Sequence, residues 1–317
     1  MKRSLGVIVV LFAIALAAFA YFAFRDTHAS FGELRAELEK RWDISDSHFG
    51  GENAPVVVVF EDAHIAAVEK ENAERVSTLH EIFPLDVVLL ENIAIAPDAP
   101  ENVKMNQTIS RAIEIDQEKI LTNAGKGAGK TLERPEPSSK IYDRFFSDPR
   151  FDAFGFEDAE VFAQIAPLAI GEETLDQYSD IVTVGYTPIC LQGRYHHSAL
   201  LFIKVAEVLN QYAPGYPRFD IERLSSKKDG LYILGKEDCN YIGEMMVQHR
   251  IWTIEHGLYP RNKIAVENSL KYMKAKKYRY GALIIGADHL RKHPFRGGKT
   301  VQEHLKEQGV SYIVVAM

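Results

Sequence analysis

Histidine and carboxylate side chains stand after three short apolar runs of this sequence. The runs are residues 56–60, 87–90 and 281–285, and the polar residues after them are Glu61, Asp62 and His64, then Glu91, and then His289. A neutral imidazole can take a proton from water when a carboxylate orients it. Alternatively, two imidazoles and a carboxylate can bind a divalent metal that activates water. The residue types and their spacing leave both chemistries open.

Two further polar residues, Glu157 and Arg261, stand at the start of a loop or a helix. An arginine can stabilise the negative charge that develops during hydrolysis. Glu157 follows the apolar segment 154–156 and is a candidate for the same site, whereas Asp158 beside it can instead cap a helix. The sequence contains no His-Glu-x-x-His pattern, which excludes this common class of zinc protease.

The apolar runs predict how these side chains are positioned. Residues 56–60 read Val-Val-Val-Val-Phe, and such a β-branched run is typical of an interior strand of a parallel sheet. Open α/β sheets place their ligands at the carboxyl ends of the strands. If the first two runs form adjacent parallel strands, Glu91 lies near His64.

Amphipathic segments alternate with these runs. We expect helices at residues 31–42, 65–82, 236–255, 262–277 and 300–308, and a last strand at residues 310–316. The segment 256–261 separates the two long helices of the last third. The pattern predicts an α/β fold with a mostly parallel central sheet and helices on both faces, preceded by one N-terminal transmembrane helix.

The N-terminus predicts contact with a membrane. Residues 5–24 are uninterrupted and apolar, long enough to cross a bilayer as a helix, and Lys2 and Arg3 favour a cytoplasmic amino end. Cleavage as a signal peptide is the alternative, because residues 18–20 read Ala-Phe-Ala. Both interpretations predict an extracytoplasmic domain, and the first predicts a single-pass membrane protein.

We therefore divide the chain into a membrane anchor or signal segment at residues 1–25, a tether with a short helix at residues 26–54, and an α/β domain at residues 55–317. The net charge of -7 disfavours a nucleic-acid partner. Cys190 and Cys239 are the only cysteines, either two free thiols or one disulfide.

Four motifs resemble the superfamily of erythromycin-esterase-like, ChaN-like and TraB/PrgY/TIKI proteins. They are the segments 59–64 (Val-Phe-Glu-Asp-Ala-His), 87–92 (Val-Val-Leu-Leu-Glu-Asn), 261–268 (Arg-Asn-Lys-Ile-Ala-Val-Glu-Asn) and 286–289 (Gly-Ala-Asp-His). The resemblance runs in order through most of residues 55–317. It implies metal-dependent proteolysis in the TIKI-like branch, a metal-free histidine base in the esterase-like branch, haem binding in ChaN-like members and peptide-signal binding in PrgY-like members.

Together with the N-terminal apolar segment, this resemblance predicts a membrane-anchored, extracytoplasmic hydrolase of a small molecule or a peptide. His64 is then the general base or a metal ligand, and Glu61 and Glu91 orient it or complete the metal sphere. Arg261 binds an anionic group, His289 is the second ligand or an acid, and Glu157 supports the site. The metal would be manganese, cobalt or zinc, held by His64, Glu91 and His289. The alternative is a protein that binds haem or a peptide in the same pocket without turnover.

Overall fold

The computed structural model describes residues 30–91, 140–158, 161, 181–184, 187–190, 206, 210, 215–223, 227–228, 231–232, 236–293 and 297–317. The predicted membrane segment, residues 1–25, lies outside this part of the chain. Within the described residues, no helix combines the length and the apolar character that crossing a membrane requires.

Six strands form the central sheet, in the order β1-β10-β2-β9-β3-β4. Their bounds are β1 Ile44–His48, β2 Val56–Asp62, β3 Val87–Leu90, β4 Ala153–Gly155, β9 Tyr280–Gly286 and β10 Ser311–Val315. All neighbouring pairs are parallel except β1 with β10. The predicted α/β class is confirmed.

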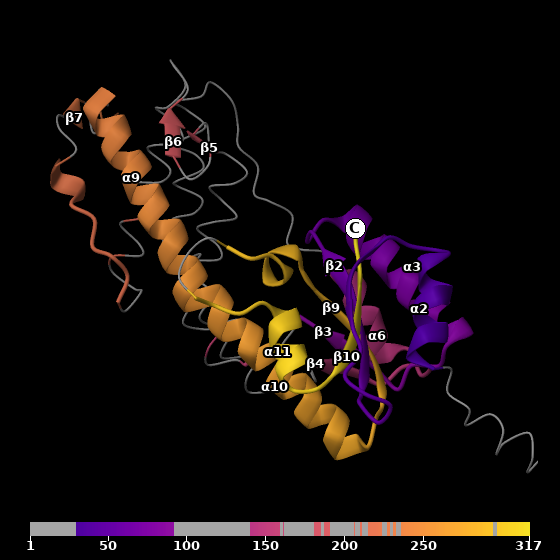
Figure 1. Ribbon diagram of the computed structural model, residues 1–317. Helices are drawn as coiled ribbons and strands as arrows, with labels where there is room; N and C mark the ends of the chain where they lie inside the picture. The colour runs from indigo at the N-terminus through magenta and orange to yellow at the C-terminus, as the bar shows by residue number, and fades with distance from the viewer. Residues whose placement is uncertain are drawn as a thin grey trace, which may run out of the picture.

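Helices cover both faces of this sheet (Figure 1). On one face lie α2 (Phe31–Glu39), α3 (Ala66–Ile82) and α6 (Arg144–Ser147), which bury side chains such as Leu38, Val76 and Phe145. On the other face, α10 (Tyr259–Lys276) and α11 (Val301–Glu307) bury Val266 and Leu305. Because both faces are covered, the interior strands are largely apolar.

Side chains of β2 alternate between the two faces. Val56, Val58 and Phe60 belong to the core under α2 and α3, whereas Val57 and Val59 belong to the core under α10 and α11. This alternation follows from the two-residue period of a strand. It therefore decides which face each polar residue at the end of β2 approaches.

The first two apolar runs form β2 and β3, but these strands are not adjacent. Strand β9 lies between them and pairs in parallel with both. The prediction that adjacency brings Glu91 to His64 is therefore wrong in its geometry. The sequence offers no local signal that a strand near the C-terminus inserts between two N-terminal strands, because strand order depends on long-range pairing.

The segment 45–51, whose sequence indicates a break after the first helix, overlaps strand β1 (Ile44–His48). It pairs antiparallel with β10 and forms one edge of the sheet. Its sequence, Ile-Ser-Asp-Ser-His, lacks the apolar run of the interior strands. An edge strand with one covered side needs less apolar surface, which explains why a hydrophobicity pattern misses it.

The two long helices of the last third are continuous with each other. Helix α9 (Lys236–Thr253) leads through a π-helical turn, η3 (Ile254–Leu258), directly into α10. The predicted break at residues 256–261 is therefore wrong. A proline inside an α-helix clashes with the carbonyl four residues earlier, here His256, and the wider π-turn displaces that carbonyl from Pro260.

Shorter elements complete the described part of the chain. They are the 3-10 turns η1 (Lys140–Asp143), η2 (Ile221–Arg223) and η4 (Ala287–Leu290), and the two-stranded sheets β5–β6 (Ile181–Val184, Thr187–Cys190) and β7–β8 (Lys227–Lys228, Leu231–Tyr232). Strand β6 packs against α9. In α9, Cys239 is disulfide-bonded, and the only other cysteine of the sequence is Cys190, the last residue of β6.

Candidate functional site

His64 stands two residues beyond the end of β2, at the carboxyl edge of the sheet. Its backbone φ of 54° lies in the left-handed region, which is uncommon for a residue other than glycine. Its side chain remains 51% exposed, while its Nδ1 lies 3.2 Å from Oδ2 of the buried Asp62. The hydrogen bond with Asp62 raises the pKa of His64 to about 9, against the opposing effect of burial.

Asp62, rather than Glu61, is the carboxylate that holds this imidazole. The Asp62 side chain is 1% exposed and lies on the face covered by α3. Glu61 alternates to the opposite side of β2, where its Oε1 lies 3.2 Å from Nη2 of Arg291. The sequence interpretation named Glu61 as the residue that orients His64. The two-residue alternation of β2 places Asp62 in that position instead.

Glu91 gathers several donors at the end of β3. Its Oε1 lies 2.5 Å from Nη2 of Arg261 and 3.2 Å from Nε2 of His289. Its Oε2 accepts a hydrogen bond of 2.8 Å from the backbone N–H of Gly286, and lies 3.6 Å from Nε2 of His64. Burial raises the pKa of Glu91, but the charges of His289 and Arg261 outweigh it and hold this pKa well below its usual range.

Arg261 joins Glu91 to Glu157. Its Nε donates to Oε1 of Glu157 at 3.0 Å, and its Nη2 contacts both carboxylates. Glu157 reaches this point because the Phe156 N–H bonds to the Leu90 carbonyl and continues the pairing of β4 with β3. The sequence predicted that Arg261 binds an anionic group. Among the described residues, Arg261 contacts these two buried carboxylates.

His289 lies in the 3-10 turn η4 after β9 and is 3% exposed. Its Nδ1 lies 2.5 Å from Oδ1 of Asn262, whose Nδ2 donates to the Lys299 carbonyl. Asn262 therefore fixes the imidazole from behind, and Nε2 faces Glu91. This burial makes His289 a residue that positions Glu91 rather than one that reaches solvent.

Gly286, the last residue of β9, makes room for His64. A Cβ at this position would lie 2.6 Å from Nε2 of His64 and 3.4 Å from Oε2 of Glu91. The absence of a side chain thus lets the imidazole and the carboxylate approach each other over the end of β9. Strand β9 separates β2 from β3, yet its terminal glycine allows the contact across it.

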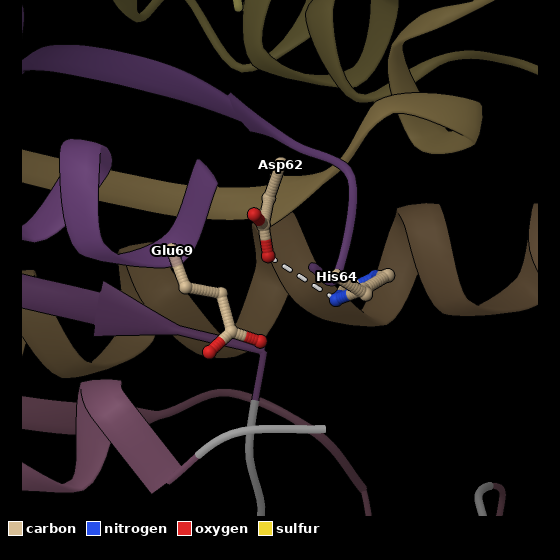
Figure 2. A group of neighbouring side chains, drawn as sticks. All are labelled: Asp62, His64 and Glu69. Carbon is tan, nitrogen blue, oxygen red and sulfur yellow. Dashed lines mark ion pairs between the residues drawn. The ribbon is translucent and has the colours of Figure 1, made fainter. Parts of the chain in front are cut away.

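A second cluster adjoins His64 on the α3 side. Asp62, His64 and Glu69 each offer a ligand atom, and these atoms lie within 4.8 Å of one another. Figure 2 shows the Asp62 and Glu69 side chains reaching toward the same space, with the imidazole of His64 beside them. Burial, together with the charge of Asp62, raises the pKa of Glu69 to about 7.

The predicted metal ligands His64, Glu91 and His289 are brought together, but their donors have other partners. Arg261 and the Gly286 N–H already contact the Glu91 carboxylate, and Asn262 contacts His289. A cation at Glu91 would therefore compete with a buried guanidinium. The cluster of Asp62, His64 and Glu69 is a second donor set, in which each residue offers one ligand atom.

The sequence interpretation noted Asp62 at the end of the first strand but gave it no role, and it missed Glu69, Asn262 and Gly286 as site residues. The position of Asp62 could have been predicted from the alternation of side chains along the strand, which also places Val58 and Val59 on opposite faces of the sheet. Glu69 lies in a helix rich in charged residues, and nothing in its local sequence distinguishes it from the exposed Glu71 or Glu74. Its burial depends on how α3 packs on the sheet.

No protein-family model matches the sequence, and no curated protein matches it significantly. Among solved structures, it is similar to a protein from Bacillus cereus, with 11% identity and a TM-score of 0.33, over 90% of this chain and 74% of that chain. It is also similar to a mutant of the erythromycin esterase EreC in its open conformation, with 14% identity and a TM-score of 0.34, over 84% of this chain and 70% of that chain. EreC is by name an erythromycin esterase, a branch that the sequence resembles. At these TM-scores neither likeness supports an argument, and the resemblance to the TraB and ChaN-like branches stays a prediction.

Proposed function

We propose that this protein is a hydrolase in which His64 transfers the proton of the attacking water. The observation that carries the proposal is an accessible imidazole, 51% exposed, whose Nδ1 is held by a carboxylate that is 1% exposed. Glu91 and His289, by contrast, are largely buried and contact each other. His64 is thus the residue of this cluster that can touch a substrate.

The contact with Asp62 fixes which nitrogen of His64 is available. In the neutral form of His64, which prevails above its pKa of about 9, Nδ1–H donates to Asp62 and Nε2 is left to accept a proton from water, as in other carboxylate-oriented histidine bases. The 3.6 Å between Nε2 and Glu91 is longer than a hydrogen bond, so this nitrogen is not occupied by Glu91. Glu91 instead supplies negative charge that stabilises the imidazolium formed during the reaction.

The same electrostatic arrangement suits the second half of a hydrolysis. The two carboxylates favour the protonated ring, which can return its proton to the leaving group. Arg261 and His289 keep Glu91 ionised and in place. In this proposal His64 is the catalytic residue, whereas Asp62, Glu91, Arg261, His289 and Glu157 are positioning residues.

We further propose that the hydrolase acts outside the cytoplasm, anchored by the apolar segment 5–24. The disulfide of Cys239 supports this location, because structural disulfides persist in oxidising compartments. The substrate is a small molecule or a peptide. Binding of haem or a peptide without turnover is the alternative, and no contact among the described residues favours it.

The experiment is a hydrolysis assay of the purified chain against chromogenic esters and peptide amides, with His64→Gln beside the wild type. We expect His64→Gln to lower kcat/KM by on the order of 10²- to 10⁴-fold, the usual contribution of a positioned acid–base group. His48→Gln is the matched control, since His48 lies in the edge strand β1. Unchanged activity in His64→Gln, or a wild type inactive on both substrate classes, would refute the proposal.

A further inference from the structure

Two carboxylates approach each other in the buried space between β2 and α3. Asp62 is 1% exposed and Glu69 is 2% exposed. The charge of Asp62 acts on Glu69, and the positive group that opposes it is His64. Burying two like charges is unfavourable unless a cation or hydrogen-bond donors compensate them.

Unpartnered polar atoms gather at the same place. Oδ1 of Asp62 and Oδ1 of Asn72 are buried without a hydrogen-bond partner, although both residues are at least 99% buried. The hydroxyl of Tyr142 lies beside these two residues and interacts with both side chains. Buried polar atoms are nearly always satisfied in native proteins. Two unsatisfied oxygens at the same place, those of Asp62 and Asn72, therefore indicate a bound species.

The orientation of Asn72 is fixed by the backbone. Its Nδ2 donates to the Glu61 carbonyl at 2.9 Å, so the amide oxygen is the atom left over. Asn72 follows Glu69 by three residues in α3, which places both on one face of the helix. On this face, Tyr142 of η1 packs against α3. The leftover oxygens of Asp62 and Asn72 and the carboxylate of Glu69 thus share one enclosed space.

We propose that Asp62 Oδ1, the Glu69 carboxylate and Asn72 Oδ1 bind one divalent cation of the oxygen-preferring class, such as Mn²⁺ or Mg²⁺. Carboxylate and amide oxygens are the ligands that these hard cations select. The assignment separates the two oxygens of Asp62, because Oδ2 holds His64 and Oδ1 faces the cation. It differs from the predicted set of His64, Glu91 and His289, and it does not depend on the proposed hydrolase activity.

The test is a titration of the full chain, stripped with EDTA, with Mn²⁺. Electron paramagnetic resonance of the free ion and isothermal calorimetry measure binding. We expect about one equivalent of bound Mn²⁺ in the wild type, and at least roughly tenfold weaker binding in Glu69→Gln, which removes one charged ligand. Glu74→Gln is the matched control, because it makes the same chemical change at an exposed position of α3. It should bind as the wild type does.

Two results would overturn the proposal. One is a wild type that binds no Mn²⁺ at millimolar concentration, which would mean that water or a shared proton satisfies these oxygens. The other is Glu69→Gln and Glu69→Asp variants that both bind as tightly as the wild type. Glu69→Asp keeps the charge, but its shorter side chain moves the carboxylate oxygens away from the cation. It therefore tests the proposal if Glu69→Gln does not fold. Thermal unfolding in EDTA establishes which variants are folded.

Because binding is measured directly, the cation site and the hydrolase can fail separately. Mn²⁺ bound without hydrolysis of any substrate would leave the cation site standing and remove the hydrolase. Hydrolysis by an EDTA-stripped chain that does not bind Mn²⁺ would support the hydrolase and remove the cation site.

Discussion

The carboxylate of Glu91 lies 3.6 Å from the imidazole of His64, although strand β9 separates the strands that the two residues follow. The contact is made over the end of β9, where Gly286 has no side chain and donates its N–H to Glu91. The site is thus formed by the ends of three strands, β2, β9 and β3, and the contribution of each can be tested.

Asp62→Asn and Glu61→Gln separate the two carboxylates at the end of β2. Asp62 contacts His64, whereas Glu61 contacts Arg291 on the other side of the strand. We expect Asp62→Asn to lower kcat/KM by on the order of 10²- to 10⁴-fold, because an amide no longer holds the required tautomer of the imidazole. Glu61→Gln should change kcat/KM by less than about threefold, since Glu61 does not contact His64 and its partner Arg291 is 57% exposed, where an ion pair contributes little. The reverse order would show that the alternation of β2 does not decide which carboxylate acts.

Gly286→Ala tests the approach of His64 across β9. The backbone at Gly286 has a φ of -56°, which alanine adopts without strain, so the fold should survive. The new Cβ would lie 2.6 Å from Nε2 of His64 and must displace the imidazole. A misplacement of about 1 Å can lower the rate on the order of 100-fold. The measurement is kcat/KM together with thermal unfolding. Gly32→Ala is the control, because a Cβ at Gly32 would have its nearest neighbour at 4.0 Å. Full activity in Gly286→Ala would contradict this role.

Arg261→Met tests the buried ion pairs. The change leaves Glu91 and Glu157 without their arginine, and removing one partner of a buried pair costs about 3–5 kcal/mol of the free energy of unfolding. Adding Glu157→Gln should restore part of this loss, because it removes one of the two uncompensated charges. Urea unfolding measures both.

The control for Arg261→Met is Lys263→Met in the same helix, which breaks an exposed pair with Glu267. It should cost less than about 1 kcal/mol. Equal losses in the two variants would mean that the Arg261 contacts contribute no more than a surface pair.

The sequence predicts the parts of this structure that depend on local patterns. The apolar run of β2 indicates a buried strand, and the polar residues after β2, β3 and β9 indicate the edge at which they meet. What it does not reveal depends on long-range packing. The insertion of β9 between β2 and β3 and the burial of Glu69 against the sheet both result from contacts between segments far apart in the chain. That Asp62 rather than Glu61 lies on the α3 side could have been predicted from the two-residue period of the strand, because Asp62 follows Phe60 by two residues.

His249 makes stability depend on pH, away from the proposed site. It is 3% exposed, and its Nδ1 lies 2.8 Å from the Tyr216 hydroxyl. Burial, aided by the charge of Arg250, lowers its pKa to about 4, whereas an unfolded histidine has a pKa of about 6.5. Between these values the unfolded chain binds the additional proton. The free energy of unfolding therefore falls as the pH drops from about 6.5 to about 4, by roughly 3 kcal/mol from this residue.

Chemical unfolding at several pH values measures this effect, with His249→Gln beside the wild type. The variant has no titrating group at this position, so its free energy of unfolding should fall less over the same pH range. His256→Gln is the control, because His256 is an exposed histidine of the same continuous helix, and its profile should follow the wild type. If the profiles of His249→Gln and the wild type run parallel, His249 is not neutral in the folded protein, and the loss of stability in acid has another source.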